Sequence, residues 1–479
     1  KKGIRLLNIL NNNAGGSVVL EGGDVHIAKI QAAGQGTLKL NEADANYKFG
    51  EVALDSDNQF KLVVHENAVL KGPAEGSVNF GNTDNGLKSL DFTANKNLTI
   101  ENGINIYSTK LNETGVNNNG TLIFTGDSIF SAKSDGQNIA GVKVQGANKT
   151  VKLLQDIKAN GNIELPDNAT LEVAGNVTAA DIKGAAGAGQ GTLRFINTGD
   201  TTVTGTVGAG NKLQSIEFAG GNVTFANVVT HGGQDFIFNG KNASVVKFNA
   251  ALANDSSNFV NNSEANGVEH IVELNANQNF TGNLAVDNAA TKQIAFDIGT
   301  GDKTATLQGA VQGDGAKFIN RGVSGRGNLE LNKDGLTIYS AGTDTPQLDP
   351  IAVHESATTT NGASADTITI VAGKTGTIGG VISGTDFDLA GAGSTAKFLD
   401  GVTLKVAVAD TAGDKGIVEF LGGGTVEAGN TIGADGGNRV KIVTFSDVAG
   451  KTLTFGSKVF ANETINIRKG TFKPGNNDV

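Results

Sequence analysis

The sequence predicts an all-β protein, a right-handed parallel β-helix (β-solenoid) built of degenerate, glycine-rich modules. Three observations predict it: short alternating runs recur along the chain, glycine supplies 68 of 479 residues while proline supplies 5, and one glycine phrase is repeated. A repeating strand unit that cannot bury its own apolar face does so by stacking on its neighbour. Parallel strands are joined by right-handed crossovers, which sets the expected hand.

The expected strands are short runs in which apolar and polar residues alternate. Apolar residues two positions apart point to the same side of a strand. Most runs are bounded by Gly, Asn or Asp, which tolerate the left-handed backbone of tight turns. Such runs lie at 162–165 (NIEL), 170–175 (TLEVAG), 246–249 (VKFN), 328–332 (NLELN) and 402–408 (VTLKVAV). No sustained helical period competes with this alternation, so the sequence predicts no helix.

The repeated phrase places a glycine, an apolar residue and then phenylalanine or leucine at fixed offsets. GQGTLRF at 189–195 has relatives at 34–40, 74–80, 118–124 and 414–420. We interpret each copy as a turn followed by a core strand, written once per module. A coil of this kind takes roughly 20–25 residues, which gives about 20 coils.

A longer comparison supports the repeat. Residues 191–195 map onto 416–420, and residues 213–218 map onto 440–445 at nearly the same shift. Two glycine-rich strands and the segment between them therefore recur together. The irregular spacing of the other copies indicates loops of varied length on a regular frame.

One stretch interrupts the pattern and divides the chain. Residues 341–366 (AGTDTPQLDPIAVHESATTTNGASAD) hold two of the five prolines and show little alternation. We expect a long loop or a junction there, between a β-solenoid region at 1–340 and its continuation at 367–479.

The composition excludes several classes of protein. Cys, Met and Trp are absent, which removes disulfides and thiolate metal sites and suits a chain that crosses an oxidising periplasm unfolded. The formal charge of −10 and the scattered basic residues disfavour nucleic acid as a partner. No apolar window is long enough for a membrane-spanning helix.

Two short sequences resemble the end of a phosphate-binding loop, but neither has the complete motif. The sequence AGKT at 372–375 and 449–452 ends like a Walker A motif. The motif also needs a glycine five positions before its Gly-Lys pair, where this chain has Ile368 and Phe445. We therefore interpret both as lysine-containing turns between strands.

Catalytic and metal-binding patterns are equally weak. No Gly-x-Ser-x-Gly elbow accompanies the histidines, which are His26, His65, His231, His270 and His354. The carboxylate pairs at 55–58 (DSDN) and 386–389 (DFDL) lack the cationic and aromatic neighbours of a sugar-cleaving site. We expect no enzyme, and we assign no catalytic, cofactor-binding or metal-ligating residue.

Two further patterns are ascribed to turns. Glycine–aspartate phrases at 22–25, 313–316 and 433–437 are isolated, whereas a calcium-binding β-roll repeats them in a nonapeptide array. Asn-x-Thr triplets are expected by composition, with asparagines in turns or in ladders.

The residues at 189–229 (GQGTLRFINTGDTTVTGTVGAGNKLQSIEFAGGNVTFANVV) resemble the passenger repeats of the rickettsial outer membrane protein A and B group, the surface cell antigen autotransporters. Residues 416–445 are similar to the same phrase, and the resemblance covers most of the chain. It implies a β-helical passenger that is exported through the outer membrane, displayed on the cell surface, and involved in attachment to and entry into host cells. It implies no catalytic residues and no cofactor.

Two functions stay open at this point. The first is an adhesin that binds a host-cell surface protein through an extended β-helical surface, with 341–366 as the candidate contact. The second is a structural surface layer in which neighbouring copies pack side by side, and a polysaccharide-degrading enzyme is a minor alternative. Because no signal peptide follows Lys1 and no barrel strands end the chain, we expect a secreted passenger or part of one, held to the membrane only through a barrel absent from it.

Overall fold

The computed structural model contains strands, turns and loops, and none of the residues that it describes is helical. No helix among them is long and apolar enough to span a membrane. Two compact units, Lys1–Ser244 and Val245–Val479, divide the chain. Both are parallel β-solenoids, with about 18 turns in all, so the predicted fold is confirmed. The described residues are 3–55, 59–112, 120–134, 138–186, 189–231, 234–254, 257–263, 268–281, 284–286, 294–298, 303–309, 311–312, 316–321, 327–342, 348–445 and 449–474.

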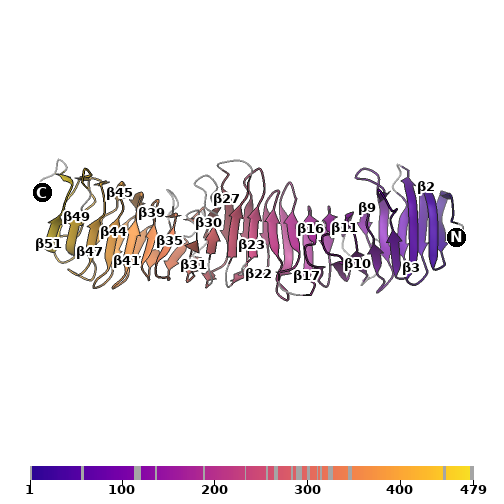
Figure 1. Ribbon diagram of the computed structural model, residues 1–479, viewed down its shortest axis with the longest axis horizontal. Coiled ribbons are helices and arrows are strands. Elements are labelled where there is room, and N and C mark those ends of the chain that lie inside the picture. Colours follow the sequence, from indigo (N-terminus) through magenta and orange to yellow (C-terminus); the bar gives the residue numbers. More distant parts are fainter. Residues whose placement is uncertain are drawn as a thin grey trace. The chain divides into compact units, whose positions relative to one another are not determined.

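The regular coils of the first unit contribute strands to three parallel ladders, so these coils have three sides. Figure 1 shows successive strands of the unit side by side in sequence order. Between residues 150 and 238, strand partners on one side of the solenoid are 20 to 23 residues apart, as expected.

Ladder 1A consists of β6 (Val78–Phe80), β9 (Ile104–Leu111), β11 (Ser128–Ser134), β13 (Thr150–Leu153), β16 (Thr170–Val173), β18 (Thr192–Phe195), β20 (Ser215–Phe218) and β23 (Gln234–Phe238). Ladder 1B consists of β14 (Ile157–Lys158), β17 (Val177–Gly184), β19 (Thr201–Val207) and β21 (Val223–Phe225). Ladder 1C consists of β3 (Ala45–Leu54), β5 (Ala68–Lys71), β8 (Leu98–Ile100), β10 (Thr121–Phe124), β12 (Gly141–Val144), β15 (Ile163–Leu165), the second halves of β17 and β19, and β22 (Val229–His231). The first coils add β1 (Leu7–Leu20), β2 (Asp24–Leu40), β4 (Lys61–Val64) and β7 (Leu87–Phe92).

The second unit also has three long ladders. Ladder 2A consists of β24 (Val245–Phe248), β27 (His270–Leu274), β30 (Ile294–Asp297), β33 (Ala316–Ile319), β36 (Ser340–Ala341), β39 (Ala363–Ser364), β42 (Val381–Ser383), β45 (Val402–Lys405), β48 (Gly424–Val426), β50 (Thr452–Phe455) and β52 (Thr471–Pro474). Ladder 2B consists of β28 (Gln278–Phe280), β31 (Thr304–Leu307), β34 (Asn328–Leu331), β37 (Ile351–Val353), β40 (Thr367–Ile370), β43 (Asp386–Leu389) and β46 (Val408–Ala409). Ladder 2C consists of β35 (Leu336–Ile338), β38 (Ala357–Thr359), β41 (Thr375–Ile378), β44 (Thr395–Phe398), β47 (Ile417–Phe420), β49 (Val440–Phe445) and β51 (Ala461–Ile467). Shorter pairings join β26 (Ser257–Asn261), β29 (Leu284–Val286) and β32 (Val311–Gln312), and β25 (Leu252–Asn254) completes the set.

Columns of apolar side chains fill the core, and some of them repeat the same residue type. In ladder 1A the rings of Phe195 and Phe218 stack with centroids 5.8 Å apart, and the ring of Phe238 follows 5.0 Å from Phe218. All three side chains are fully buried. Parallel, in-register pairing places equivalent positions of successive coils above one another, so an alternating sequence produces a continuous apolar column.

The repeated glycine phrase is a turn followed by a core strand, as predicted. Gly189 and Gly191 have φ angles of 80° and 75°, and β18 begins directly afterwards. A methyl group on Gly191 would lie 2.3 Å from Cβ of Leu165 in the preceding coil. At the equivalent Gly416 it would lie 2.6 Å from Cδ1 of Leu389. Glycine is therefore required because the backbone passes directly over a core leucine.

Turn asparagines and aspartates link one coil to the next. Oδ1 of Asp156 accepts a hydrogen bond from the backbone N–H of Asn176 at 2.7 Å, and Oδ1 of Asn176 accepts one from the N–H of Thr202 at 2.8 Å. Other asparagines, such as Asn148 and Asn168, adopt positive φ in tight turns. The prediction of asparagines in turns is thus confirmed at Asn148 and Asn168.

The described part of 341–366 differs from the expected long loop. Residues 348–366 contain β37, β38 and β39, which pair in register with the coils on either side. The strands are only two or three residues long, too short for a visible alternation. Pro350 does not interrupt the stack, because its carbonyl oxygen accepts a hydrogen bond from Leu329 N–H. The expectation of a loop was therefore wrong for these residues, while 343–347 lie outside the described part.

Candidate binding surface

The histidines do not form a catalytic centre in the described part of the chain. His26, His65 and His354 are exposed, and the side chain of His231 lies outside the described residues. His270 is fully buried, with Nε2 2.6 Å from Oγ of the equally buried Ser263. Burial lowers the pKa of His270 from 6.5 to about 4, so the ring is neutral at pH 7. A neutral Ser–His pair sealed in the core has no access to substrate and serves packing.

The carboxylates of the sequence patterns accept hydrogen bonds from adjacent coils. Asp388, from the 386–389 pair, accepts hydrogen bonds from the N–H and Oγ1–H of Thr411. Asp55 accepts one from the Gly34 N–H at 2.7 Å, whereas 56–58 and 313–315 lie outside the described residues. Within the described ranges, no three His, Asp or Glu side chains gather as metal ligands would.

Both AGKT sequences are turns whose lysines are paired with carboxylates. Gly373 has a φ of 71°, and Nζ of Lys374 bonds to Oε2 of Glu355. Nζ of Lys451 lies 2.6 Å from Oδ2 of Asp400. This lysine, together with the Gly423 N–H, holds the pKa of Asp400 below its ordinary value.

Outward charges on ladder 1A form a column that follows the stacking direction. Glu172 is bridged by Nζ of Lys152 at 2.7 Å and by Nη1 of Arg194 at 3.2 Å. Nε of Arg194 also lies 2.6 Å from Oε2 of Glu217. These hydrogen bonds to two glutamates raise the pKa of Arg194. These charges are paired with one another within the molecule, and the ion pairs fix the register of neighbouring coils.

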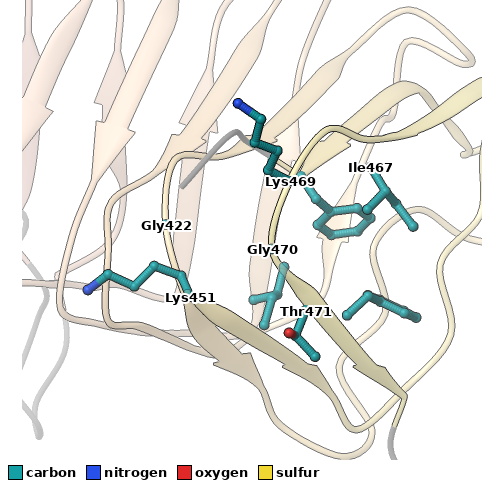
Figure 2. Close-up of a pocket in the computed structure, with 9 residues that line it drawn as sticks. Gly422, Lys451, Ile467, Lys469, Gly470 and Thr471 are labelled. Carbon is teal, nitrogen blue, oxygen red and sulfur yellow. The ribbon is translucent and has the colours of Figure 1, made fainter. Parts of the chain in front are cut away.

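A hollow in the last described coils is too small for a ligand. Its volume is about 20 Å³, which is about the space of one water molecule. Figure 2 shows the ammonium groups of Lys451 and Lys469 pointing away from Ile467. The lining combines apolar side chains with the backbone of Gly422 and Gly470.

Three larger hollows lie on the outer faces. One, of about 340 Å³, is a shallow depression that includes Asn105 and Lys152. The second, of about 230 Å³, surrounds Tyr107 in the first unit. The third, of about 240 Å³, surrounds Tyr339 in the second unit. The sequence patterns did not identify any of them, because each is assembled from residues of several coils.

Comparison with known proteins identifies relatives. Outer membrane protein B of Rickettsia prowazekii (strain Madrid E) is 27% identical over 462 residues, covering 86% of this chain and 27% of that protein. Outer membrane protein B of Rickettsia conorii (strain ATCC VR-613 / Malish 7) is 32% identical over 233 residues, covering 45% and 14%. The chain is related to rickettsial outer membrane protein B. No protein-family model and no solved structure matches the chain.

This relationship confirms the resemblance seen in the sequence. It indicates a location at the cell surface or in the outer membrane, and it fits a surface autotransporter passenger. The relatives are named as outer membrane proteins and not as enzymes. The chain spans 27% or less of the length of these two relatives.

Proposed function

We propose that this chain is part of an autotransporter passenger that acts as an adhesin, mediating attachment to and entry into host cells. The observation that carries the proposal is the similarity to outer membrane protein B over 86% of the chain. The β-solenoid supports it, because stacked coils expose a large surface on which contacts with a host-cell protein can be distributed.

The chemistry of the outer surface also favours an adhesin over a surface layer in which copies of the chain pack closely side by side. Large apolar side chains that are exposed in the described residues are few, and they are Ile4, Leu6, Val19, Val381, Ile465 and Ile467. Other outward positions include ion-paired side chains, such as the Lys152–Glu172–Arg194 column. A side-by-side coat with a dry interface would need a contiguous apolar face.

The test uses latex beads coated with the intact chain and applied to cultured host cells. We expect adherence and uptake above the level of albumin-coated beads, and competition by the soluble chain. Beads that adhere no better than albumin-coated ones would contradict the adhesin function. If the same purified chain formed ordered sheets under the electron microscope, the surface-layer function would replace it.

A further inference from the structure

Two of the three hollows are each lined by a tyrosine, a residue type that the repeat pattern alone does not require. The chain has three tyrosines. Tyr47 is fully buried, and its hydroxyl donates a hydrogen bond to the Leu20 carbonyl oxygen. The other two, Tyr107 and Tyr339, are half-buried, and each lines one hollow.

Both tyrosines belong to the same sequence phrase, which begins with a turn glycine in both copies. The phrase Gly-x-x-Ile-Tyr-Ser occurs at 103–108 and again at 335–340. Its glycine takes a positive φ in both copies, 77° at Gly103 and 75° at Gly335. The isoleucine and serine that flank each tyrosine are buried. Tyr107 points outward because side chains alternate along β9. Tyr339 lies at the bend between β35 and β36, and it is half-buried between two buried neighbours.

The hollow around Tyr107 is walled by a small hairpin. Gly81 and Gly86 form an antiparallel bridge, and Oδ1 of Asn82 accepts hydrogen bonds from the N–H groups of Asp84 and Asn85. A methyl group on Gly86 would lie 2.7 Å from the Tyr107 carbonyl oxygen, so the base of the hairpin rests on the strand. The hairpin therefore stands beside the outward tyrosine as a preformed wall.

Polar groups of the same coil and of the following coils complete this hollow. They are the side chains of Thr109, Ser131, Lys133 and Gln155. Among the described residues none of these four has a hydrogen-bond or ion-pair partner. The charged side chains of the Lys152–Glu172–Arg194 column differ from these four, because they are paired with one another.

The hollow around Tyr339 has the same chemical character. Its lining includes Ser364 and Ser383, which bond to each other at 2.9 Å, and the exposed Asn361. It also includes Ser340, which is 4% exposed and whose Oγ has no hydrogen-bond partner in the described part of the chain. A buried hydroxyl without a partner is costly unless something supplies the bond.

We propose that these two hollows, the Tyr107 hollow and the Tyr339 hollow, are equivalent subsites for neutral sugar residues of a glycan, one in each unit. A pyranose presents a face of C–H groups that packs on an aromatic ring, and a rim of hydroxyls that exchange hydrogen bonds with hydroxyls, amides and ammonium groups. Volumes of about 230 and 240 Å³ suit a single sugar ring and fall below the ~300 Å³ at which pockets for drug-sized ligands begin. The formal charge of −10 disfavours polyanionic glycans.

Saturation-transfer NMR tests the proposal on the intact chain, with lactose, N-acetyllactosamine and chitotriose as separate probes. We expect transfer to the ring C–H protons of at least one sugar. Y107A and Y339A should each remove about half of that signal, and the double variant should lower it at least tenfold. The double Y107F/Y339F variant keeps the ring face and should retain most of it. The matched control is I123A, which truncates an outward residue of β10 that lines neither hollow.

Three results would overturn the proposal: no transfer to any of the three sugars, an unchanged signal in the double alanine variant, or an equal loss in the double phenylalanine variant. If an alanine variant loses its β-type circular dichroism, K133A and N361A take its place, since both side chains are exposed. An unchanged signal in both would then count against the proposal. The inference does not rest on the adhesin function, because sugar binding is measured without cells.

Discussion

Replacing Phe218 by alanine tests whether stacked core columns hold the coils together. The ring is fully buried, stacks on Phe195 at 5.8 Å and lies tilted against Phe238 at 5.0 Å, with Phe225 edge-on at 6.3 Å. Truncation of a buried phenylalanine costs about 3–5 kcal/mol, because transfer free energy is lost and a cavity remains. Each aromatic pair accounts for about 0.5–1.5 kcal/mol of such stabilisation. We therefore expect F218A to lie near the upper end of the range, and F218L to cost much less.

Native-state hydrogen exchange is the appropriate assay, because repeat arrays do not unfold in one step and each coil contacts mainly its neighbours. A cost of 3–5 kcal/mol corresponds to about a hundredfold to several thousandfold faster exchange. The loss should centre on β18, β20 and β23, while β1 and β2 stay protected. The control I237A removes an outward, half-buried side chain of β23 and should cost under about 1 kcal/mol. Uniform deprotection of the first unit, or a cost below 1 kcal/mol for F218A, would refute the stacking argument.

Three further changes give measurable outcomes. G191A should destabilise the coils around β18 by at least about 2 kcal/mol, because Gly191 has a φ of 75° and an added methyl group would lie 2.3 Å from Leu165. The control is G199A, whose added methyl group meets no atom within 4 Å, so its hydrogen exchange should change little. Similar costs in both variants would contradict the role of close approach. The pKa of His270 is about 4 in the folded state, against the ordinary value of 6.5. Its contribution to the free energy of unfolding is therefore complete above pH 6.5 and is lost as the pH falls toward 4, by about 3 kcal/mol in all. Urea denaturation of the wild type and of H270N at pH 7.5 and 4.5 should show a smaller pH dependence of stability in the variant. R194M should cost about 1 kcal/mol at low ionic strength and less in 1 M NaCl, and a salt-independent cost would argue that the side chain acts by packing.

The fold was predictable because its determinants are local. Alternation along β18, the glycine turn before it and the asparagine turns are each readable within a few residues. The stretch 341–366 was misread for the same reason. Its strands β37–β39 are held by pairing with neighbouring coils and not by a pattern of their own. Short strands in a stack need only one or two inward side chains, which a sequence window cannot distinguish from a loop.

The candidate subsites were not predictable. Tyr107 stands beside a hairpin from the coil before it and beside Ser131 from the coil after it. The buried Ser263–His270 pair was also missed, since nothing in the spacing of two polar residues shows that both face the core. The recurrence of Gly-x-x-Ile-Tyr-Ser was the one signal in the sequence that pointed toward the hollows.

The amino-acid sequence by itself determined that this chain forms strands, that glycine and asparagine turn them, and that modules repeat, because these properties depend on side-chain alternation and on the backbone freedom of single residues. Only the tertiary structure decided that the coils have three sides and which outward side chains converge. That outcome depends on the number of residues in each coil, since adding or removing one residue between two strands changes which side chains lie above one another.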